Sequence, residues 1–201
     1  MRELFAQIPG MLVDAVIYSA ILLVFLIGLS KCVFPYRRGA RLLRRATRSL
    51  ELMVTKEGTR PVWQDPLFLG KPMQENWKRF LLNAEQLDMR GLSCNCEDYI
   101  NDEEAFGSYA HLQLAEVIPG LLTSLGILGT FIGLMRGLGN LDISSADSTM
   151  KGISTMIGGM TFAYGTSIAG VTGSLIFNVF FRASQGSAWS AMDDFHSAFE
   201  E

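Results

Sequence analysis

Residues 117–135 read VIPGLLTSLGILGTFIGLM and contain no charged side chain. A helix of about 20 apolar residues is long enough to span the hydrocarbon core of a bilayer. Residues 11–29 are equally apolar except for Asp14, and residues 152–181 again carry no charge. The last stretch is longer than one span needs, so we expect it to tilt or to extend beyond the bilayer. The sequence therefore predicts an all-α membrane protein with three transmembrane helices, of which the second and third form a hairpin.

The distribution of Lys and Arg predicts the orientation in the membrane. The first apolar stretch is followed by a dense basic cluster, made of Lys31, Arg37, Arg38, Arg41, Arg44, Arg45 and Arg48. The linker 136–151 holds only Arg136 and Lys151. Because loops rich in Lys and Arg stay in the cytoplasm, we expect the N-terminus and the hairpin tip outside and the C-terminus inside. The arginines also fall near one helical face, which favours either contact with anionic lipid or docking to a partner.

The chain is expected to have four segments: a first transmembrane helix (1–35), a helical cytoplasmic insert (36–111), a transmembrane hairpin (112–182) and the start of a cytoplasmic tail (183–201). Within the insert, residues 73–88 and 98–115 have helical patterns. Helical spacing in the tail predicts one apolar side, formed by Trp189, Met192, Phe195 and Phe199. The tail carries no helix stop signal, so a longer tail is one expectation.

Composition and motifs argue against catalysis, metal binding and nucleic-acid binding. Only 18% of the residues are charged and the net charge is −3, without the basic excess that binds nucleic acid. Cys94 and Cys96 form an isolated C-x-C, whereas a zinc site needs about four ligands. The sequence contains no phosphate loop, nucleophile elbow or HExxH motif. We therefore expect no enzyme, no metal site and no cofactor, and we assign the cysteines no role.

Small residues recur at intervals of four in the second and third apolar stretches. The second stretch has one such stripe and the third has two neighbouring ones: Gly129, Gly133 and Gly137; Gly165, Ala169 and Gly173; Thr166, Gly170 and Ser174. Such stripes let helix backbones approach closely in a membrane. Packing of the hairpin on itself is the simplest interpretation. Two stripes on one helix also favour contact on two sides, as in an oligomer that lines a shared centre.

Hydroxyl groups are prominent among the polar side chains of the hairpin, among them Thr130, Thr166 and Ser167. In lipid, such hydroxyls usually bond the carbonyls of their own helix, and the alternative is a hydrated ion path. Neither hairpin stretch contains Asp, Glu, Lys, Arg or His, although ion-coupled transport usually needs an ionisable group in the membrane. Asp14, close to the expected outer end of the first helix, is interpreted as an interfacial carboxylate. A protein that moves protons would therefore take its titrating acid from a partner.

Three motifs resemble those of the MotA/TolQ/ExbB proton-channel family. The stretch from Pro119 to Leu134 is similar to the penultimate helix of that family, and residues 163–170, AYGTSIAG, are similar to its last helix. Asn178 and Arg182 match the polar residues at the exit of the last helix. The resemblance covers roughly residues 106–182 and extends to the three-helix topology. Within the family, the sequence of the penultimate-helix motif looks most like that of the ZorA branch, the membrane motor subunits of Zorya anti-phage systems.

The resemblance implies a channel-forming stator subunit in the bacterial inner membrane, driven by the proton-motive force. Five copies would surround a dimer of a single-span partner of the MotB/ExbD/TolR/ZorB kind, which supplies a membrane Asp. Carried over residue by residue, Thr130, Thr166 and Ser167 are the hydroxyls that face this Asp. Family members use protons or sodium, and we expect protons because they are the more frequent ion. The alternatives are a TolQ/ExbB-like energiser of an envelope process and a structural scaffold without ion flux.

Overall fold

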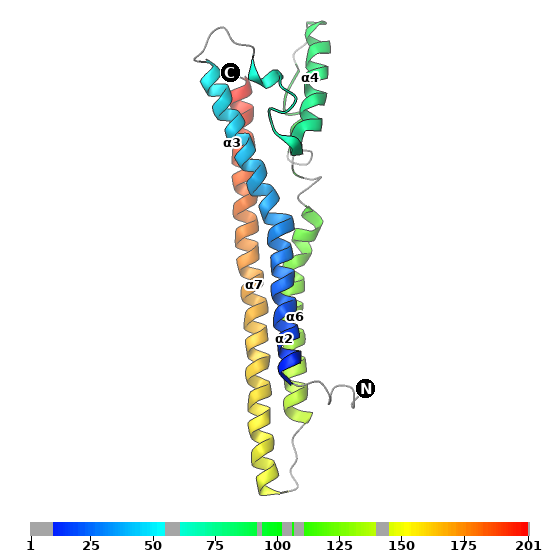
Figure 1. The fold of residues 1–201 in the computed structure, drawn as a ribbon, viewed down its shortest axis with the longest axis vertical. Coiled ribbons are helices and arrows are strands. Elements are labelled where there is room, and N and C mark those ends of the chain that lie inside the picture. Colours follow the sequence, from blue (N-terminus) through cyan, green and yellow to red (C-terminus); the bar gives the residue numbers. More distant parts are fainter. Residues whose placement is uncertain are drawn as a thin grey trace. The chain divides into compact units, whose positions relative to one another are not determined.

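The computed structural model describes residues 10–54, 61–91, 94–101, 106, 111–139 and 145–200. Within these ranges the chain consists of helices and turns without a strand (Figure 1). Three helices are long and apolar enough to cross a membrane. The prediction of an all-α protein with three transmembrane helices is confirmed.

The first apolar stretch forms α2, Gly10–Gly28, which continues through a π-helical turn, Leu29–Val33, into α3, Phe34–Val54. The wider turn lies where the apolar sequence gives way to the basic one. α3 is amphipathic, because residues such as Leu43 and Leu50 are buried whereas its arginines are exposed. The arginines of α3 therefore form a solvated face, and its apolar residues belong to a core.

The hairpin helices are α6, Leu112–Gly139, and α7, Ala146–Glu200. Both are longer than the charge-free stretches that predicted them, and α7 is a single helix of 55 residues. Contacts within the chain define two compact units. Unit 1 comprises Met1–Leu29 and Gln113–Val179, and unit 2 comprises Ser30–Leu112 and Phe180–Glu201. Unit 1 thus holds α2, nearly all of α6 and the first part of α7.

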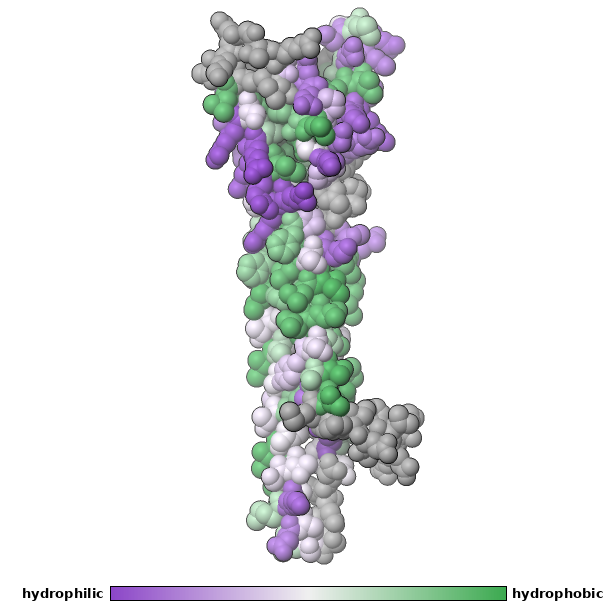
Figure 2. Space-filling view, in the orientation of Figure 1, coloured by the Kyte–Doolittle hydropathy of each residue, from purple (hydrophilic) through white to green (hydrophobic). Residues whose placement is uncertain are grey.

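Unit 2 is built around an aromatic core. It contains α3, the end of α7, α4 (Gln74–Asp88) and two short 3₁₀ turns, Val62–Gln64 and Lys71–Met73. Trp77 of α4 is fully buried, stacks on Phe80, and donates its indole N–H to the carbonyl of Trp63 at 2.9 Å. Phe195 of α7 meets the Trp77 ring edge-on. On the face drawn in Figure 2, hydrophilic side chains gather over α3 and α4, and hydrophobic side chains cover α2.

Two local predictions for unit 2 are confirmed only in part, since Met192 and Phe195 of the predicted apolar side are buried. Trp189 is 49% exposed, because the buried side of α7 here passes through Ala188, Ala191 and Phe195 instead. Residues 97–99 form a turn where a helix was predicted from residue 98, whereas Phe106 and residues 112–115 are helical as predicted. The stretches 102–105 and 107–110 of that predicted helix lie outside the described residues.

Candidate functional site

α6 and α7 pack through a row of glycines in α6, made of Gly126, Gly129, Gly133 and Gly137, all buried. A Cβ placed at Gly133 would lie 2.7 Å from the carbonyl oxygen of Gly159, and one placed at Gly126 would lie 3.1 Å from that of Thr166. The two backbones are therefore in direct contact, as small-residue stripes permit in a membrane. We call this contact the glycine seam, which on α7 consists of Gly159, Ala163, Thr166 and Gly170.

The second stripe of α7 is also contacted within the same subunit. A Cβ placed at Gly165 would lie 2.5 Å from the hydroxyl oxygen of Tyr18 in α2. One placed at Gly173 would touch Leu122 of α6 at 3.9 Å, whereas Ala169 is partly exposed. The two sides of α7 are thus partly occupied by α2 and α6, so the stripes do not by themselves require a second subunit.

The Thr166 side chain lies inside the glycine seam. It is fully buried, and a Cβ placed at Gly129 would collide with its Oγ1 and Cβ atoms. Its hydroxyl donates to the carbonyl oxygens of Phe162 at 3.2 Å and Ala163 at 2.9 Å. Within this subunit Thr166 therefore contributes to helix packing and has no exposed surface. Its assignment to the ion path stays a prediction.

Thr130 and Ser167 lie beside the seam and are both partly exposed. The Thr130 hydroxyl donates to the carbonyl oxygen of Ile127 at 2.6 Å, so its lone pairs stay available to accept a hydrogen bond. The Ser167 hydroxyl makes no hydrogen bond to any residue in the described ranges. The Cα atom of Ser167 lies 3.4 Å from a Cβ placed at Gly126. Gly126 lies on α6, about one helical turn before Thr130. Two hydroxyls thus lie beside the glycine seam, one able to accept a hydrogen bond and the other able to donate one.

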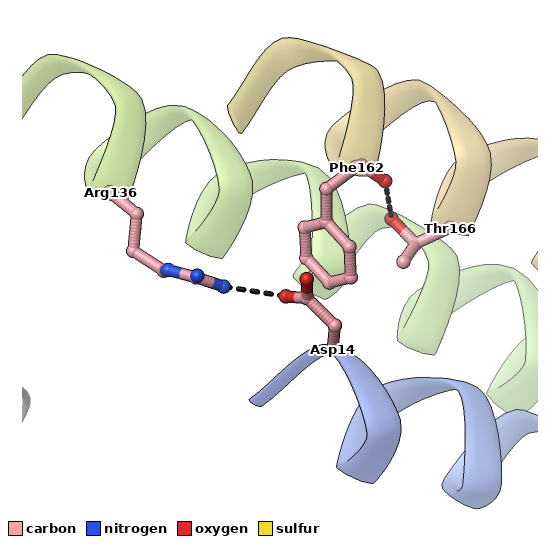
Figure 3. A network of polar contacts seen from close by, with 4 residues as sticks. All are labelled: Asp14, Arg136, Phe162 and Thr166. Carbon is pink, nitrogen blue, oxygen red and sulfur yellow. Dashed lines mark hydrogen bonds and ion pairs between the residues drawn. The ribbon is translucent and has the colours of Figure 1, made fainter. Parts of the chain in front are cut away.

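A charged network joins α2, α6 and α7 (Figure 3). Asp14 of α2 accepts a hydrogen bond from Arg136, near the end of α6, with Oδ1 and Nη1 2.6 Å apart. The Arg136 guanidinium lies 5.9 Å from the ring centroid of Phe162 in α7, and Tyr18 meets the same ring edge-on. The two charged side chains are 37% and 36% exposed. One ion pair and two ring contacts therefore connect all three helices of unit 1.

A cavity of about 330 Å³ lies next to this network. Asp14, Arg136 and Phe162 line one part of it, and Thr155 and Gly158 line another. It is large enough for several water molecules and has the polar partners that ordered water needs. The ion pair is therefore placed where water can reach it.

The sequence indicated Asp14 but not its partner. Arg136 was assigned to the linker, because the charge-free stretch ends one residue earlier at Met135. A usable signal was present: Asp14 and Arg136 carry opposite charges and were both expected on the outer side of the membrane. Opposite charges at the same expected depth of two membrane helices are candidates for pairing.

The remaining motif residues occupy different settings. Pro119 lies inside α6, and its carbonyl oxygen accepts a hydrogen bond from the Thr123 hydroxyl at 3.0 Å. Asn178 and Arg182 are exposed, and neither forms a side-chain hydrogen bond or an ion pair with the part of the chain that is described. Their role in the exit motif stays a prediction.

Comparisons with known proteins extend these observations. The sequence model of the MotA/TolQ/ExbB proton channel family matches residues 69–196. A protein described as Zorya protein ZorA, from the Crooks strain of Escherichia coli, is 41% identical over 81 residues, which are 39% of this chain and 14% of the relative. A second Zorya protein ZorA, from Escherichia coli O139:H28, is 26% identical over 83 residues, or 41% of this chain and 11% of the relative.

The chain therefore corresponds to only a small part of each of these two relatives. The family match is wider, since residues 69–196 include the whole of α6, most of α7 and the glycine seam. Together with the three membrane-length helices, it identifies a channel-type membrane protein and not a member of an enzyme family. The chain belongs to the MotA/TolQ/ExbB proton channel family.

Proposed function

We propose that the chain is the channel-forming stator subunit of a proton-driven rotary motor complex. In this proposal, five copies surround a dimer of a single-span partner of the MotB/ExbD/TolR/ZorB kind. The insert and the C-terminus lie in the cytoplasm and the N-terminus lies outside. The likeness to two Zorya proteins supports an anti-phage defence complex as the machine that the motor drives.

The observation that best supports the proposal is the ion pair between Asp14 and Arg136. The stretches 117–135 and 152–181 contain no acidic, basic or histidine side chain, and Asp14 is the one acidic residue in α2. An ion carrier must bind and release its ion, whereas Asp14 already has a fixed counter-charge at 2.6 Å. A channel of this family therefore needs a carboxylate from elsewhere, and a partner helix that carries an Asp supplies it.

Thr130 and Ser167 are the hydroxyls that we assign to the ion path. A carboxylate in an apolar pore is unstable when charged and alternates between two protonation states. Thr130 accepts a hydrogen bond from the protonated acid, because its own proton is engaged with Ile127. Ser167 donates to the charged acid, since its hydroxyl has no partner among the described residues. Thr166 supports both indirectly by keeping α6 and α7 in contact.

Thr130→Val is expected to leave the subunit folded and to lower ion-coupled activity strongly. Valine keeps the shape of threonine and removes the hydroxyl. The protonated form of the partner's acid therefore loses one hydrogen bond, which contributes about 0.5–1.5 kcal/mol. The measurement is ion flux or phage protection with the partner present, with size-exclusion chromatography as the assembly check. Thr123→Val is the matched control, because Thr123 also lies on α6, is partly exposed and bonds its own helix.

Full activity of Thr130→Val would contradict the assignment of Thr130 and would leave its hydroxyl with the single role of bonding Ile127. Equal losses in both threonine variants would point to a general effect on α6. A wild-type complex that assembles with the partner but moves no ion would favour the structural scaffold instead.

Native mass spectrometry in mild detergent is expected to detect five copies of the chain, and five plus two after co-expression with the partner. The unoccupied part of α7 supports lateral contacts, because it carries exposed apolar side chains: Tyr164, Ile168, Val171, Leu175 and Val179. A stable monomer or dimer under conditions that keep the subunit folded would overturn the pentamer and assign this face to lipid.

A further inference from the structure

Unit 2 contains a cavity of about 590 Å³ that the proposed ion path does not use. Arg38 of α3 lines one wall, and Lys71 with Pro72 lines another. Phe34 and Pro35, at the start of α3, also line it. Ser30, the first residue after the apolar stretch 11–29, contributes as well. The cavity therefore combines two cations with apolar side chains at the sequence position where a membrane span ends.

The two cations have no counter-ion in the described part of the chain. Arg38 and Lys71 are both exposed, and neither forms a hydrogen bond or an ion pair with the residues described. Two neighbours on α3 differ, since Arg37 donates to Ser184 at 3.1 Å and Arg44 donates to Ser187 at 3.0 Å. Like charges on one cavity repel each other. An anion between Arg38 and Lys71 would replace that repulsion with two attractions.

The fold fixes Lys71 in this position. Gly70 has a φ of +80°, which favours glycine, and a Cβ placed there would lie 3.3 Å from Leu42 of α3. Met73, two residues after Lys71, is 1% exposed and anchors the other end of the turn. The cation on the turn and the cation on α3 are thus held on one cavity before any ligand arrives.

The apolar wall selects the kind of anion. Phe34 is 59% exposed although it lines the cavity, so an apolar group beside it would remove that ring from water. Inorganic phosphate provides the charge but no apolar group. We propose that the cavity binds an anionic phospholipid, with its phosphate between Arg38 and Lys71 and its glycerol and acyl part against Phe34. This site does not rest on ion transport and would exist in a subunit that moves no ion.

The test uses the full chain in mild detergent, titrated separately with phosphatidylglycerol, phosphatidylcholine and inorganic phosphate, with the shift in melting temperature as the readout. Of these three compounds, only phosphatidylglycerol is expected to raise the melting temperature. Arg38→Gln/Lys71→Gln should weaken its apparent binding about thirtyfold, the product of two basic contacts. Arg45→Gln/Arg48→Gln is the matched control: it removes two exposed arginines from the same helix but none from the cavity, and it should bind like wild type.

Three results would overturn the site. Unchanged binding in the Arg38/Lys71 variant would mean that these cations do not hold the head group. An equal loss in the Arg45/Arg48 variant would reduce the effect to general attraction by the basic face of α3. An equal stabilisation by inorganic phosphate would make it a site for free phosphate. If the double variant does not fold, the single variant Lys71→Gln on the exposed turn is tested by the same criteria. Its apparent binding of phosphatidylglycerol is expected to be about fivefold weaker.

Discussion

Gly129→Leu is expected to abolish the folded transmembrane hairpin. A Cβ at this position already collides with Thr166 Oγ1 and Cβ, and Thr166 is fully buried and cannot turn away. The leucine must push α6 and α7 apart, which also removes the backbone contacts at Gly126 and Gly133. Overpacking typically destabilises by about 1–3 kcal/mol, and the value here should lie at or above the upper end, because two backbones have to move.

The measurement is thermal unfolding of the purified chain in detergent, followed by circular dichroism, together with its size-exclusion profile. Gly120→Leu is the control, since Gly120 lies on the same helix and a Cβ there meets nothing within 4 Å. The expected outcome is an unfolded or aggregated Gly129 variant and a Gly120 variant like wild type. Equal stability of the two leucine variants would show that α6 and α7 do not touch at the glycine seam.

Asp14→Arg is expected to destabilise unit 1 and to abolish ion-coupled activity, and Asp14→Arg/Arg136→Asp is expected to restore both. The single change places two cations where an ion pair of 2.6 Å stood. Because both side chains are about one third exposed, solvent screens part of this repulsion, so Asp14→Asn alone should have a smaller effect. The exchange re-forms the pair with reversed polarity. Thermal stability and ion flux with the partner are measured side by side.

Asp147→Arg provides the control, because Asp147 is exposed in the first turn of α7 and has no ion-pair partner among the described residues. A different result would be that the Asp14→Arg/Arg136→Asp variant regains thermal stability but not ion flux. It would mean that the Asp14 carboxylate itself handles the ion, and it would contradict the proposal that a partner supplies the acid.

The pattern of apolar and small residues predicted the membrane helices well, for a physical reason. Lipid leaves the backbone no hydrogen-bond partner outside its own helix, so a charge-free stretch such as 117–135 has one available structure. Glycines at intervals of four then predict which face packs. Residue type alone could not say which of the two stripes on α7 faces α6, since both have the required spacing.

What the sequence missed depends on pairings over long distances in the chain. Asp14 and Arg136 are separated by 122 positions, and no local pattern connects them. Trp189 has the spacing of a core residue but is exposed, because the side of α7 that is buried here carries Ala188 and Ala191. Thr166 matches a family motif for an ion path, yet its burial follows from Gly129 on another helix. In each case the burial or the partner of a side chain depends on a second helix that is distant in the sequence.

The glycine seam also limits how this subunit can deform. Internal motions of helical proteins usually proceed by sliding of packed helices, with the intervening side chains changing rotamer to accommodate it. Between Gly133 and Gly159, and between Gly126 and Thr166, there is no such layer, because backbone meets backbone. A slide of one residue would bring a side chain such as Leu128 or Thr130 against the opposite main chain. α6 and this part of α7 are therefore expected to move as one rigid body. In the proposed pentamer, shape changes would then occur at the borders between neighbouring hairpins.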